Sequence, residues 1–378
     1  MLRANIAGHG FCEIEWKNGR ISGIADLGTI RPGEPYCSPG LVDLQINGIA
    51  GVDFGAPGLT PHDVIRVLEP IWATGVTTFC PTVITNTQES LCRSFGVLEE
   101  ARGLSGEFAA SAPCYHLEGP YLSAGESHGA HSPQWMRDPC DEEFAALQKA
   151  AGGRIGIVTI APERRGAVPF IKKWSDTGVI FAIGHTDCET ADIERAVQAG
   201  AKLSTHLGNG CPQLIHRHRS PIWAQLATDK LAASLICDGF HLTPEFTRVA
   251  YGLKGPRNTI LVTDSTHVNG LAPGSYRLGG MPVELHESGR IAAMANPGSL
   301  AGSTLRLDRA VVQLGRAADI SFHEAILAAS RNPARLLGRD DVCDAIEVGK
   351  WANLMVFRPS RHRIEILETY LRGEHVWP

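Results

Sequence analysis

The 378-residue sequence is informative first through what it lacks. No stretch approaches the roughly 18 consecutive apolar residues that a membrane-spanning helix requires, so we expect a soluble protein without a membrane partner. The first residues show neither the basic segment nor the uninterrupted apolar core of a secretory signal, and no two cysteines are spaced as Cys-x-x-Cys. We therefore expect a cytoplasmic protein whose cysteines are mostly buried as small apolar residues.

The charge and the glycine pattern argue against two further classes of protein, those that bind nucleic acids and those that bind nucleotides. The formal net charge of −5 argues against a general nucleic-acid-binding surface, although it leaves room for a local anion pocket. The sequence contains no glycine-rich nucleotide fingerprint, no internal repeat and no low-complexity segment. With 43% hydrophobic and 20% charged residues, the composition is that of an ordinary soluble protein, and the length favours one large domain plus a small one.

Short β-branched runs alternate with helix-like stretches, which is the pattern of repeated βα units. The strand-like runs are Gly40–Asn47, Gly75–Pro81, Cys114–Gly119, Arg154–Ala161, Val179–His185, Ala201–His206, Ala232–Asp238 and Thr259–Asp264. The helix-like stretches are Pro61–Ala73, Gln88–Arg102, Asp141–Ala151, Ala167–Thr177, Glu189–Ala199, Pro221–Thr228 and Pro244–Leu253. The sequence therefore predicts an α/β protein with a (β/α)8 barrel, and a doubly wound open sheet is the structural alternative.

The two ends of the chain differ from the middle. Residues 11–16, 352–357 and 364–372 are typical of short antiparallel strands, and Asn18-Gly19 is a strong signal for a hairpin turn. We expect residues 1–38 and 345–378 to form a small β domain together, with residues 39–344 as the barrel. This arrangement requires the two termini to meet.

Four of the strand-like runs end at or next to a side chain that can bind a metal or exchange a proton. These side chains are Glu118, His185, His206 and Asp264. In a parallel barrel such positions converge on one face, where loops from several strands build the active site. One carboxylate and two imidazoles suit Zn²⁺, Fe²⁺ or another borderline divalent ion that keeps open positions for water. The pattern predicts a metal-dependent hydrolase.

Such an ion lowers the pKa of bound water to about 7 and polarises an amide carbonyl. Asp264 could accept the water proton and pass it to the leaving nitrogen. Each residue also has a structural interpretation. Taken alone, His185 or His206 is more often a hydrogen-bonded structural histidine, and Glu118 or Asp264 could cap a following helix. It is their joint position that favours the metal site.

A set of motifs runs through nearly the whole chain. They are Ser38-Pro-Gly-Leu-Val-Asp43, His116-Leu-Glu-Gly-Pro120, Gly184-His-Thr186, Thr205-His-Leu207, Asp238-Gly-Phe-His241, Leu261-Val-Thr-Asp-Ser265, Ala301-Gly-Ser303, Asn332-Pro-Ala-Arg335 and Gly349-Lys-Trp-Ala-Asn353. Together they resemble the N-acetylglucosamine-6-phosphate deacetylases of the amidohydrolase superfamily. The resemblance implies a (β/α)8 barrel with a small β-sandwich domain, a homodimer, and removal of acetate from an N-acetylated amino-sugar 6-phosphate. By position, Glu118, His185 and His206 match the family's metal ligands, and Asp264 matches its general acid/base.

The first strand-like run lacks the His-x-His pair that holds a second metal in many amidohydrolases. Gln45 and Asn47 stand there instead, and their neutral amides are poor metal ligands. We therefore expect one divalent ion, Zn²⁺ first, with Fe, Co or Mn as alternatives. The two amides either hydrogen-bond near the metal-bound water or are only turn residues before Gly48.

The stretch from Ser127 to Pro133 resembles the family's Gly-x-His element. His131 aligns with the histidine that contacts the substrate carbonyl, Ala130 lies beside it, and His128 is the competing choice. A polarised group at this place would stabilise the tetrahedral oxyanion, which is often worth about 3 kcal/mol. The alternative is a loop histidine in solvent.

Phosphate recognition follows from the resemblance alone. Asn209 and Gly210 occupy the place of the family's Asn-Ala pair, and His241 matches its assisting histidine. Arg217 takes the position of an arginine that reaches the phosphate across the dimer, while Arg219 remains possible because the next residues need a small insertion. A guanidinium suits forked phosphate contacts, although the run could equally be a solvated basic loop.

Leu300 and Ala301 are expected to line the sugar pocket, again by resemblance. The expected reaction is hydrolytic deacetylation of N-acetylglucosamine 6-phosphate. Because Gly210 departs from the usual alanine, the sugar could be altered or unphosphorylated. One alternative is therefore deacylation of another N-acylated sugar, such as the galactosamine epimer, or of an amino acid. The other is a non-catalytic sugar-binding protein.

Overall fold

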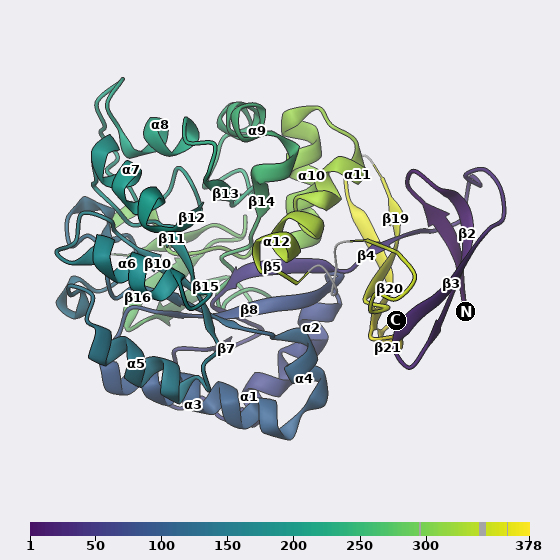
Figure 1. Cartoon of the computed structure of the whole chain (residues 1–378), viewed down its shortest axis with the longest axis horizontal. Helices are drawn as coiled ribbons and strands as arrows, with labels where there is room; N and C mark the ends of the chain where they lie inside the picture. Colours follow the sequence, from purple (N-terminus) through teal and green to yellow (C-terminus); the bar gives the residue numbers. More distant parts are fainter. Residues whose placement is uncertain (295, 340–344, 361) are drawn as a thin grey trace.

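The computed structural model describes residues 1–294, 296–339, 345–360 and 362–378. A sheet of eight parallel strands, in the order β5-β8-β9-β10-β11-β12-β13-β14, forms the centre of the larger part of the molecule (Figure 1). The strands are β5 (Leu41–Ile46), β8 (Val76–Ile84), β9 (Tyr115–Glu118), β10 (Ile155–Ile160), β11 (Ile180–Ile183), β12 (Ala201–Ser204), β13 (Ala232–Leu235) and β14 (Thr259–Leu261). The predicted (β/α)8 barrel is confirmed, and the open sheet is wrong.

Hydrogen bonds between the first and last strands close the barrel. Ile46 and Ser265 form a parallel bridge, and Asp264 N donates to the Gln45 carbonyl at 2.9 Å. The buried Asp43 carboxylate adds a side-chain connection, because Thr263 Oγ1 donates to its Oδ2 at 2.6 Å. The closure therefore fixes the backbone of Asp264 beside the first strand.

Helices surround the barrel. They are α1 (Pro61–Arg66), α2 (Leu68–Trp72), α3 (Gln88–Leu104), α4 (Gly106–Ser111), α5 (Asp141–Ala150), α6 (Ala167–Ser175), α7 (Thr190–Ala199), α8 (Pro221–Leu226), α9 (Pro244–Asn258), α10 (Leu307–Ala318), α11 (Phe322–Leu327) and α12 (Arg331–Leu336), with 3-10 turns η1 (Glu126–His128) and η2 (Pro133–Trp135). The strands are buried between these helices and the barrel interior, which explains why β5 and β9 have no exposed residue. Among the described helices, none combines the length and the apolar character needed to cross a membrane.

The expectation of one helix over residues 61–73 is wrong. The chain forms α1 and α2, which are separated at Val67. Pro70 explains the break, because it has no N–H to donate to the Arg66 carbonyl and its ring crowds that oxygen. The helices α4, α10, α11 and α12 were not predicted.

Strands from both termini form a second sheet at the other end of the molecule (Figure 1). Its order is β21-β20-β19-β4-β1-β2-β3, with β1 (Leu2–Ile6), β2 (Gly10–Lys17), β3 (Arg20–Asp26), β4 (Tyr36–Pro39), β19 (Leu354–Pro359), β20 (Ile364–Leu371) and β21 (Glu374–Trp377). The predicted Asn18-Gly19 turn joins β2 to β3. Ala352 N donates to the Gly19 carbonyl, and the Trp16 and Tyr370 rings pack edge to face. These contacts join the N-terminal and C-terminal strands around a small hydrophobic core of their own.

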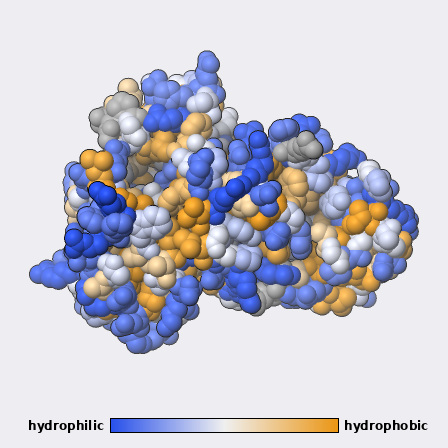
Figure 2. All heavy atoms as spheres, turned by 90° about the horizontal axis from the view of Figure 1, so that it is seen from above, coloured by the Kyte–Doolittle hydropathy of each residue, from blue (hydrophilic) through white to orange (hydrophobic). Residues whose placement is uncertain are grey.

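The small β domain built from both termini is confirmed. The predicted boundary between residues 344 and 345 lies outside the described residues, and the division of the chain into residues 1–38, 39–344 and 345–378 stays a prediction. Seen from above, the molecule has a larger and a smaller lobe, and its mostly hydrophilic surface is interrupted by apolar patches (Figure 2).

Two smaller sheets interrupt the βα pattern. The hairpin of β6 (Gly48–Ile49) and β7 (Val52–Asp53) follows β5, and a four-stranded antiparallel sheet lies between β14 and α10. The larger sheet contains β15 (Gly274–Leu278), β16 (Met281–Leu285), β17 (Ile291–Ala293) and β18 (Asn296–Leu300), and it was not predicted. Its residues Leu278, Ser299 and Leu300 line a cavity that Glu118, His185 and His206 also line.

Candidate active site

The three predicted metal ligands come together at the carboxyl ends of neighbouring strands. Glu118 is the last residue of β9, whereas His185 and His206 lie two residues beyond the ends of β11 and β12. His185, His206 and also Asp264 adopt positive φ angles of 49°, 29° and 50°. Non-glycine residues rarely adopt such angles, and strained conformations of this kind cluster at functional sites. The backbone therefore turns sharply where each side chain must point inward.

The ligand atoms have the spacing that a small divalent ion requires. His206 Nε2 lies 2.9 Å from Glu118 Oε1, His185 Nε2 lies 3.3 Å from the same oxygen, and the two nitrogens are 3.1 Å apart. In a tetrahedral site with bonds of about 2.0–2.1 Å, ligand atoms stand about 3.3 Å from one another. Three ligand atoms at nearly this spacing, from side chains that are all buried, fit one ion with an open position.

The electrostatics of the cluster favour a charged carboxylate. Burial alone would raise the pKa of Glu118, but hydrogen bonds with His185 and His206 outweigh it and hold the pKa well below its ordinary value. Gln45 Nε2 donates a further hydrogen bond to Glu118 Oε1 at 2.9 Å. Glu118 therefore presents an anionic oxygen to the site, as a metal ligand must.

Asp264 does not cap a helix, because its carboxylate is held by the first strand. Gln45 Nε2 and Asn47 Nδ2 both donate to Asp264 Oδ1, at 3.1 and 2.6 Å. Burial, followed by the negative charge of Glu118, raises the pKa of Asp264 to about 6. A buried carboxyl group with one oxygen fixed by two amides is suited to exchange a proton through its other oxygen.

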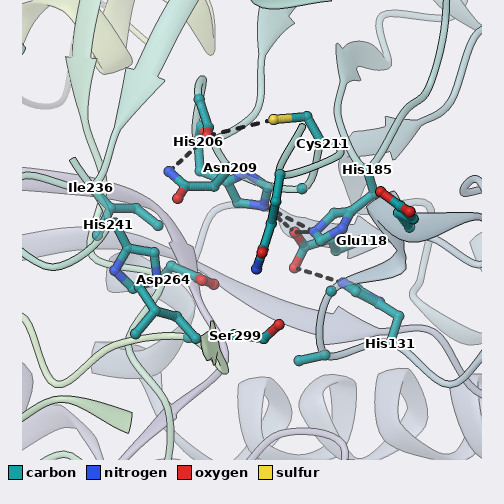
Figure 3. A pocket seen from close by; sticks show the side chains of 18 of the residues that line it. Glu118, His131, His185, His206, Asn209, Cys211, Ile236, His241, Asp264 and Ser299 are labelled. Carbon is teal, nitrogen blue, oxygen red and sulfur yellow. Dashed lines mark hydrogen bonds and ion pairs between the residues drawn. The ribbon is translucent and has the colours of Figure 1, made fainter. Parts of the chain in front are cut away.

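His131 lies on the far side of the metal-ligand cluster from Asp264 and His241 (Figure 3). Its Nε2 is 3.9 Å from Glu118 Oε2, and its Nδ1 is 2.9 Å from Thr85 Oγ1. Burial, with His185 as the second cause, lowers the pKa of His131 to about 3, so the ring is neutral. The competing His128 does not line the cavity, because its Nδ1 contacts the His131 carbonyl at 3.1 Å.

The ring of His185 is held from several directions. Its Nδ1 is 2.8 Å from the Ser127 carbonyl, which fixes the proton on Nδ1 and leaves Nε2 free to bind a metal. Ser123 Oγ donates to Asp187 Oδ2 at 2.5 Å, and Ser127 Oγ donates to Asp187 Oδ1. Gly210 passes so close that an added Cβ would lie 2.8 Å from His185 Nδ1. Asp187 thus holds the loop that positions His185.

The cluster opens into a cavity of about 350 Å³. We call the part formed by Glu118, His131, His185, His206 and Asp264, the residues predicted to carry out the reaction, the reaction end. We call the part formed by Asn209, Gly210 and His241, the residues predicted to bind the phosphate, the anion end. Aliphatic side chains complete the wall, among them Ile84, Ile215, Ile222, Ile236, Leu278 and Leu300. Of the residues that the structure describes, no lysine or arginine lines this cavity.

At the anion end, a carboxylate orients His241. Burial opposes the charged form of Asp238, but the hydrogen bond from His241 holds the pKa of Asp238 below its ordinary value. His241 Nδ1 lies 2.6 Å from Asp238 Oδ2, so its other nitrogen is available to the cavity. The basic loop that contains Arg217 and Arg219 precedes this motif in the chain and is exposed, and neither arginine lines the cavity of its own chain.

The cavity contains most of the residues predicted to bind substrate. Asn47, Ala130, His131, Asn209, Gly210, His241 and Leu300 line it. Ala301 does not, because it is fully buried in the small core beneath the four-stranded sheet, and Gln45 acts through its contacts with Glu118 and Asp264. Sequence reasoning missed Thr85, Ser127 and Asp187. Thr85 directly follows β8, so the same strand-end rule that selected Glu118 could have found it.

The fold and the site define a metal-dependent hydrolase of the amidohydrolase type. The profile of the Amidohydrolase family matches residues 36–372, and the chain belongs to this family. An N-acetylglucosamine-6-phosphate deacetylase of Bacillus subtilis is 32% identical, with 94% of this chain and 92% of the relative covered. The human protein of that name is 34% identical, with 90% and 83% covered. Within the amidohydrolases, the chain is thus a member of the N-acetylglucosamine-6-phosphate deacetylase family.

Solved structures agree with the sequence relatives. A mutant N-acetyl-D-glucosamine-6-phosphate deacetylase of Mycobacterium smegmatis, in complex with N-acetyl-D-glucosamine-6-phosphate, superposes with a TM-score of 0.88. It is 27% identical, and the match covers 100% of this chain and 98% of that one. The whole fold, including the small β domain, is therefore shared.

Proposed function

We propose that the protein hydrolyses the acetamide of N-acetylglucosamine 6-phosphate to acetate and the amino-sugar 6-phosphate. The observation that carries this proposal is the convergence of Glu118, His185 and His206, with Asp264 and His131 on opposite sides of the cluster (Figure 3). The substrate is supported by the relatives, which are N-acetylglucosamine-6-phosphate deacetylases. A non-catalytic sugar-binding role would leave Asp264 and its two amide donors without a purpose.

Glu118, His185 and His206 would hold one divalent ion. When bound, such an ion lowers the pKa of a water ligand to about 7 and polarises an acyl oxygen. We propose a single ion because Gln45 and Asn47, at the place of a second-metal ligand pair, already donate to the two carboxylates of the site. Zinc is the proposed metal, because two imidazoles and one carboxylate with an open position are typical of catalytic zinc.

The protein's own side chains would move the protons. Asp264 accepts a proton from the attacking water through Oδ2, since Gln45 and Asn47 occupy Oδ1. The water oxygen bonds to the acetyl carbon, and the neutral His131 donates a hydrogen bond to the acyl oxygen as negative charge develops there. Asp264 then passes its proton to the amide nitrogen as the C–N bond breaks, and the acetic acid formed gives its remaining proton to the amine or to solvent, so that acetate and the protonated amine leave.

We propose a homodimer in which each subunit completes the other's phosphate site. Asn209, Gly210 and His241 supply neutral or weakly basic groups, yet the described cavity wall contains no guanidinium or ammonium group. Arg217 lies on an exposed loop beside Leu214, whose side chain is 93% exposed, which fits a segment that is covered only in an assembly. Arg217 of a neighbouring copy is the proposed phosphate ligand, with Arg219 as the alternative.

A cytoplasmic location is proposed together with this metabolic role. The described cysteines are free thiols, which is compatible with a reducing compartment. The substrate is a small sugar phosphate, so neither a nucleic acid nor a membrane partner is part of the proposal.

A substrate panel tests the function. Acetate release would be measured with N-acetylglucosamine 6-phosphate, its galactosamine epimer and both unphosphorylated sugars, with metal analysis on the same sample. We expect the largest kcat/KM for N-acetylglucosamine 6-phosphate. Equal rates with and without the phosphate would favour the alternative of an unphosphorylated N-acyl sugar, and no acetate release from any of the four would contradict the deacetylase assignment.

A further inference from the structure

Thr85 contacts the reaction end through its hydroxyl group. It directly follows β8 and is 4% exposed, and its Oγ1 lies 2.9 Å from His131 Nδ1. A second possible acceptor is the backbone carbonyl of Glu118, which is 3.4 Å away. The hydroxyl has one proton, so it can donate fully to only one of these two groups.

The distances decide where that proton goes. Hydrogen bonds from hydroxyl groups to oxygen span about 2.5–3.0 Å, so the Glu118 carbonyl at 3.4 Å is a poor acceptor. The contact with His131 Nδ1 is of ordinary hydrogen-bond length. If Thr85 donates to Nδ1, this nitrogen has no proton of its own, and the proton of a neutral ring must sit on Nε2.

The other side of the ring requires the same tautomer. His131 Nε2 points at Glu118 Oε2 from 3.9 Å. A proton on Nε2 is attracted by this carboxylate, whereas a lone pair on Nε2 would be repelled by it. Both neighbours of His131 therefore favour a ring that carries its hydrogen on the nitrogen facing the cavity.

We propose that Thr85 is a positioning residue that sets the tautomer of His131. Its hydroxyl donates to Nδ1 and keeps the ring proton on Nε2, where it is available to the acyl oxygen of the substrate. No covalent bond changes in Thr85, which acts through His131 alone. The inference rests on the proposed function, because it assumes that the reaction uses the Nε2 proton.

The surrounding backbone is shaped to bring this hydroxyl close. Gly119 passes Thr85 at a distance where an added Cβ would lie 2.2 Å from Oγ1. Gly119 also has a φ of 82°, which glycine adopts readily. The close approach keeps the Thr85 side chain in place between Glu118 and His131.

An isosteric substitution tests the role of the hydroxyl. Thr85→Val keeps the shape of the side chain but removes its donor, and Thr85→Ser keeps the donor but removes a methyl group. We expect T85V to lower kcat by about 10²–10³-fold, as for the loss of one oxyanion donor, with little change in KM or metal content. T85S should retain most of the parent kcat. If T85V does not fold, Thr85→Ala takes its place.

Ring ¹⁵N chemical shifts give a second readout that does not depend on turnover. Protein labelled with ¹⁵N-histidine, with His131→Asn to assign the signal, should show His131 protonated on Nε2 in the parent and T85S, and a shifted tautomer population in T85V. A parent ring protonated on Nδ1, an unchanged tautomer in T85V, or equal losses of kcat in T85V and T85S would overturn the inference. If H131N itself keeps full turnover, the proposed role of His131 fails instead, while the shifts still decide whether Thr85 sets the ring.

Discussion

At the reaction end of the cavity, residues from distant parts of one chain contact one another and hold one another in place. Glu118, His185 and Asp264 are buried, and each has a partner that fixes its orientation. At the anion end, Asn209 and Gly210 are only partly buried, and no described lysine or arginine lines the wall. This contrast is the basis of our proposal that one subunit contains the machinery for amide hydrolysis, whereas recognition of the phosphate uses a charge from a neighbouring subunit.

The largest expected effect lies at the reaction end. Asp264→Asn keeps the shape of the side chain but cannot take a proton from water, so kcat should fall by about 10²–10⁴-fold while metal content and thermal stability stay near the parent values. Asp176→Asn, at an exposed position paired with Lys172, is the matched control. Turnover of D264N close to that of the parent would remove Asp264 from the mechanism.

A smaller effect is expected from the residues that support a ligand. Asp187→Ala removes the acceptor that holds Ser123 and Ser127, and with them the carbonyl that fixes His185. Titration of the metal-free protein against a chelating dye should show affinity about 10–100-fold weaker than in the parent. Asp176→Ala serves as the control, and equal affinities for both variants would mean that Asp187 does not act on the metal site.

The anion end is tested by an arginine substitution. Arg217→Ala should raise KM for the phosphorylated sugar about tenfold or more, because a charge-assisted hydrogen bond is worth about 1.5–3 kcal/mol. The unphosphorylated sugar should be unaffected. Arg219→Ala, in the same loop, shows which guanidinium is used. If neither variant changes KM more for the phosphorylated sugar than for the unphosphorylated one, the proposed role of the anion end is contradicted.

The pH dependence should reflect the reaction end alone. Burial, then the charge of Glu118, raises the pKa of Asp264 to about 6, and the carboxylate form is the one that accepts a proton. A bound cation favours the charged form, so kcat/KM should decline only below about pH 6, by about tenfold for each further unit. Profiles measured with phosphorylated and unphosphorylated sugars should share this limb. An acidic limb well above pH 6 would point to another group.

Sequence patterns predicted the barrel better than the elements around it. A parallel strand such as β11, with the sequence Ile-Phe-Ala-Ile, is buried throughout, so it forms a continuous apolar run, and His185 follows two residues after its end. The strands β15 and β16 are short and only partly buried, so they leave no comparable run of apolar residues. The helix α10 could have been found, because Leu307, Ala310, Val311 and Leu314 repeat at helical spacing.

Strand ends predicted the metal ligands and Asp264, whereas the family resemblance predicted other cavity residues such as His131 and Asn209. Glu118, His185, His206 and Asp264 obey the strand-end rule, and the structure brings them to one place. Ser127 and Asp187 do not obey it, because their importance depends on a contact between two loops that are distant in sequence. The phosphate site stays a prediction, since neither Arg217 nor Arg219 lines the cavity of its own chain.

Metal titration of the chelated protein is the most direct test of the account. We expect the metal-free protein to be inactive, one equivalent of a divalent ion per chain to restore acetate release, and Glu118→Gln, His185→Asn and His206→Asn each to lose that ion. Full activity without metal, a requirement for two ions, or undiminished binding in these three variants would contradict the claim that Glu118, His185 and His206 form a single catalytic metal site.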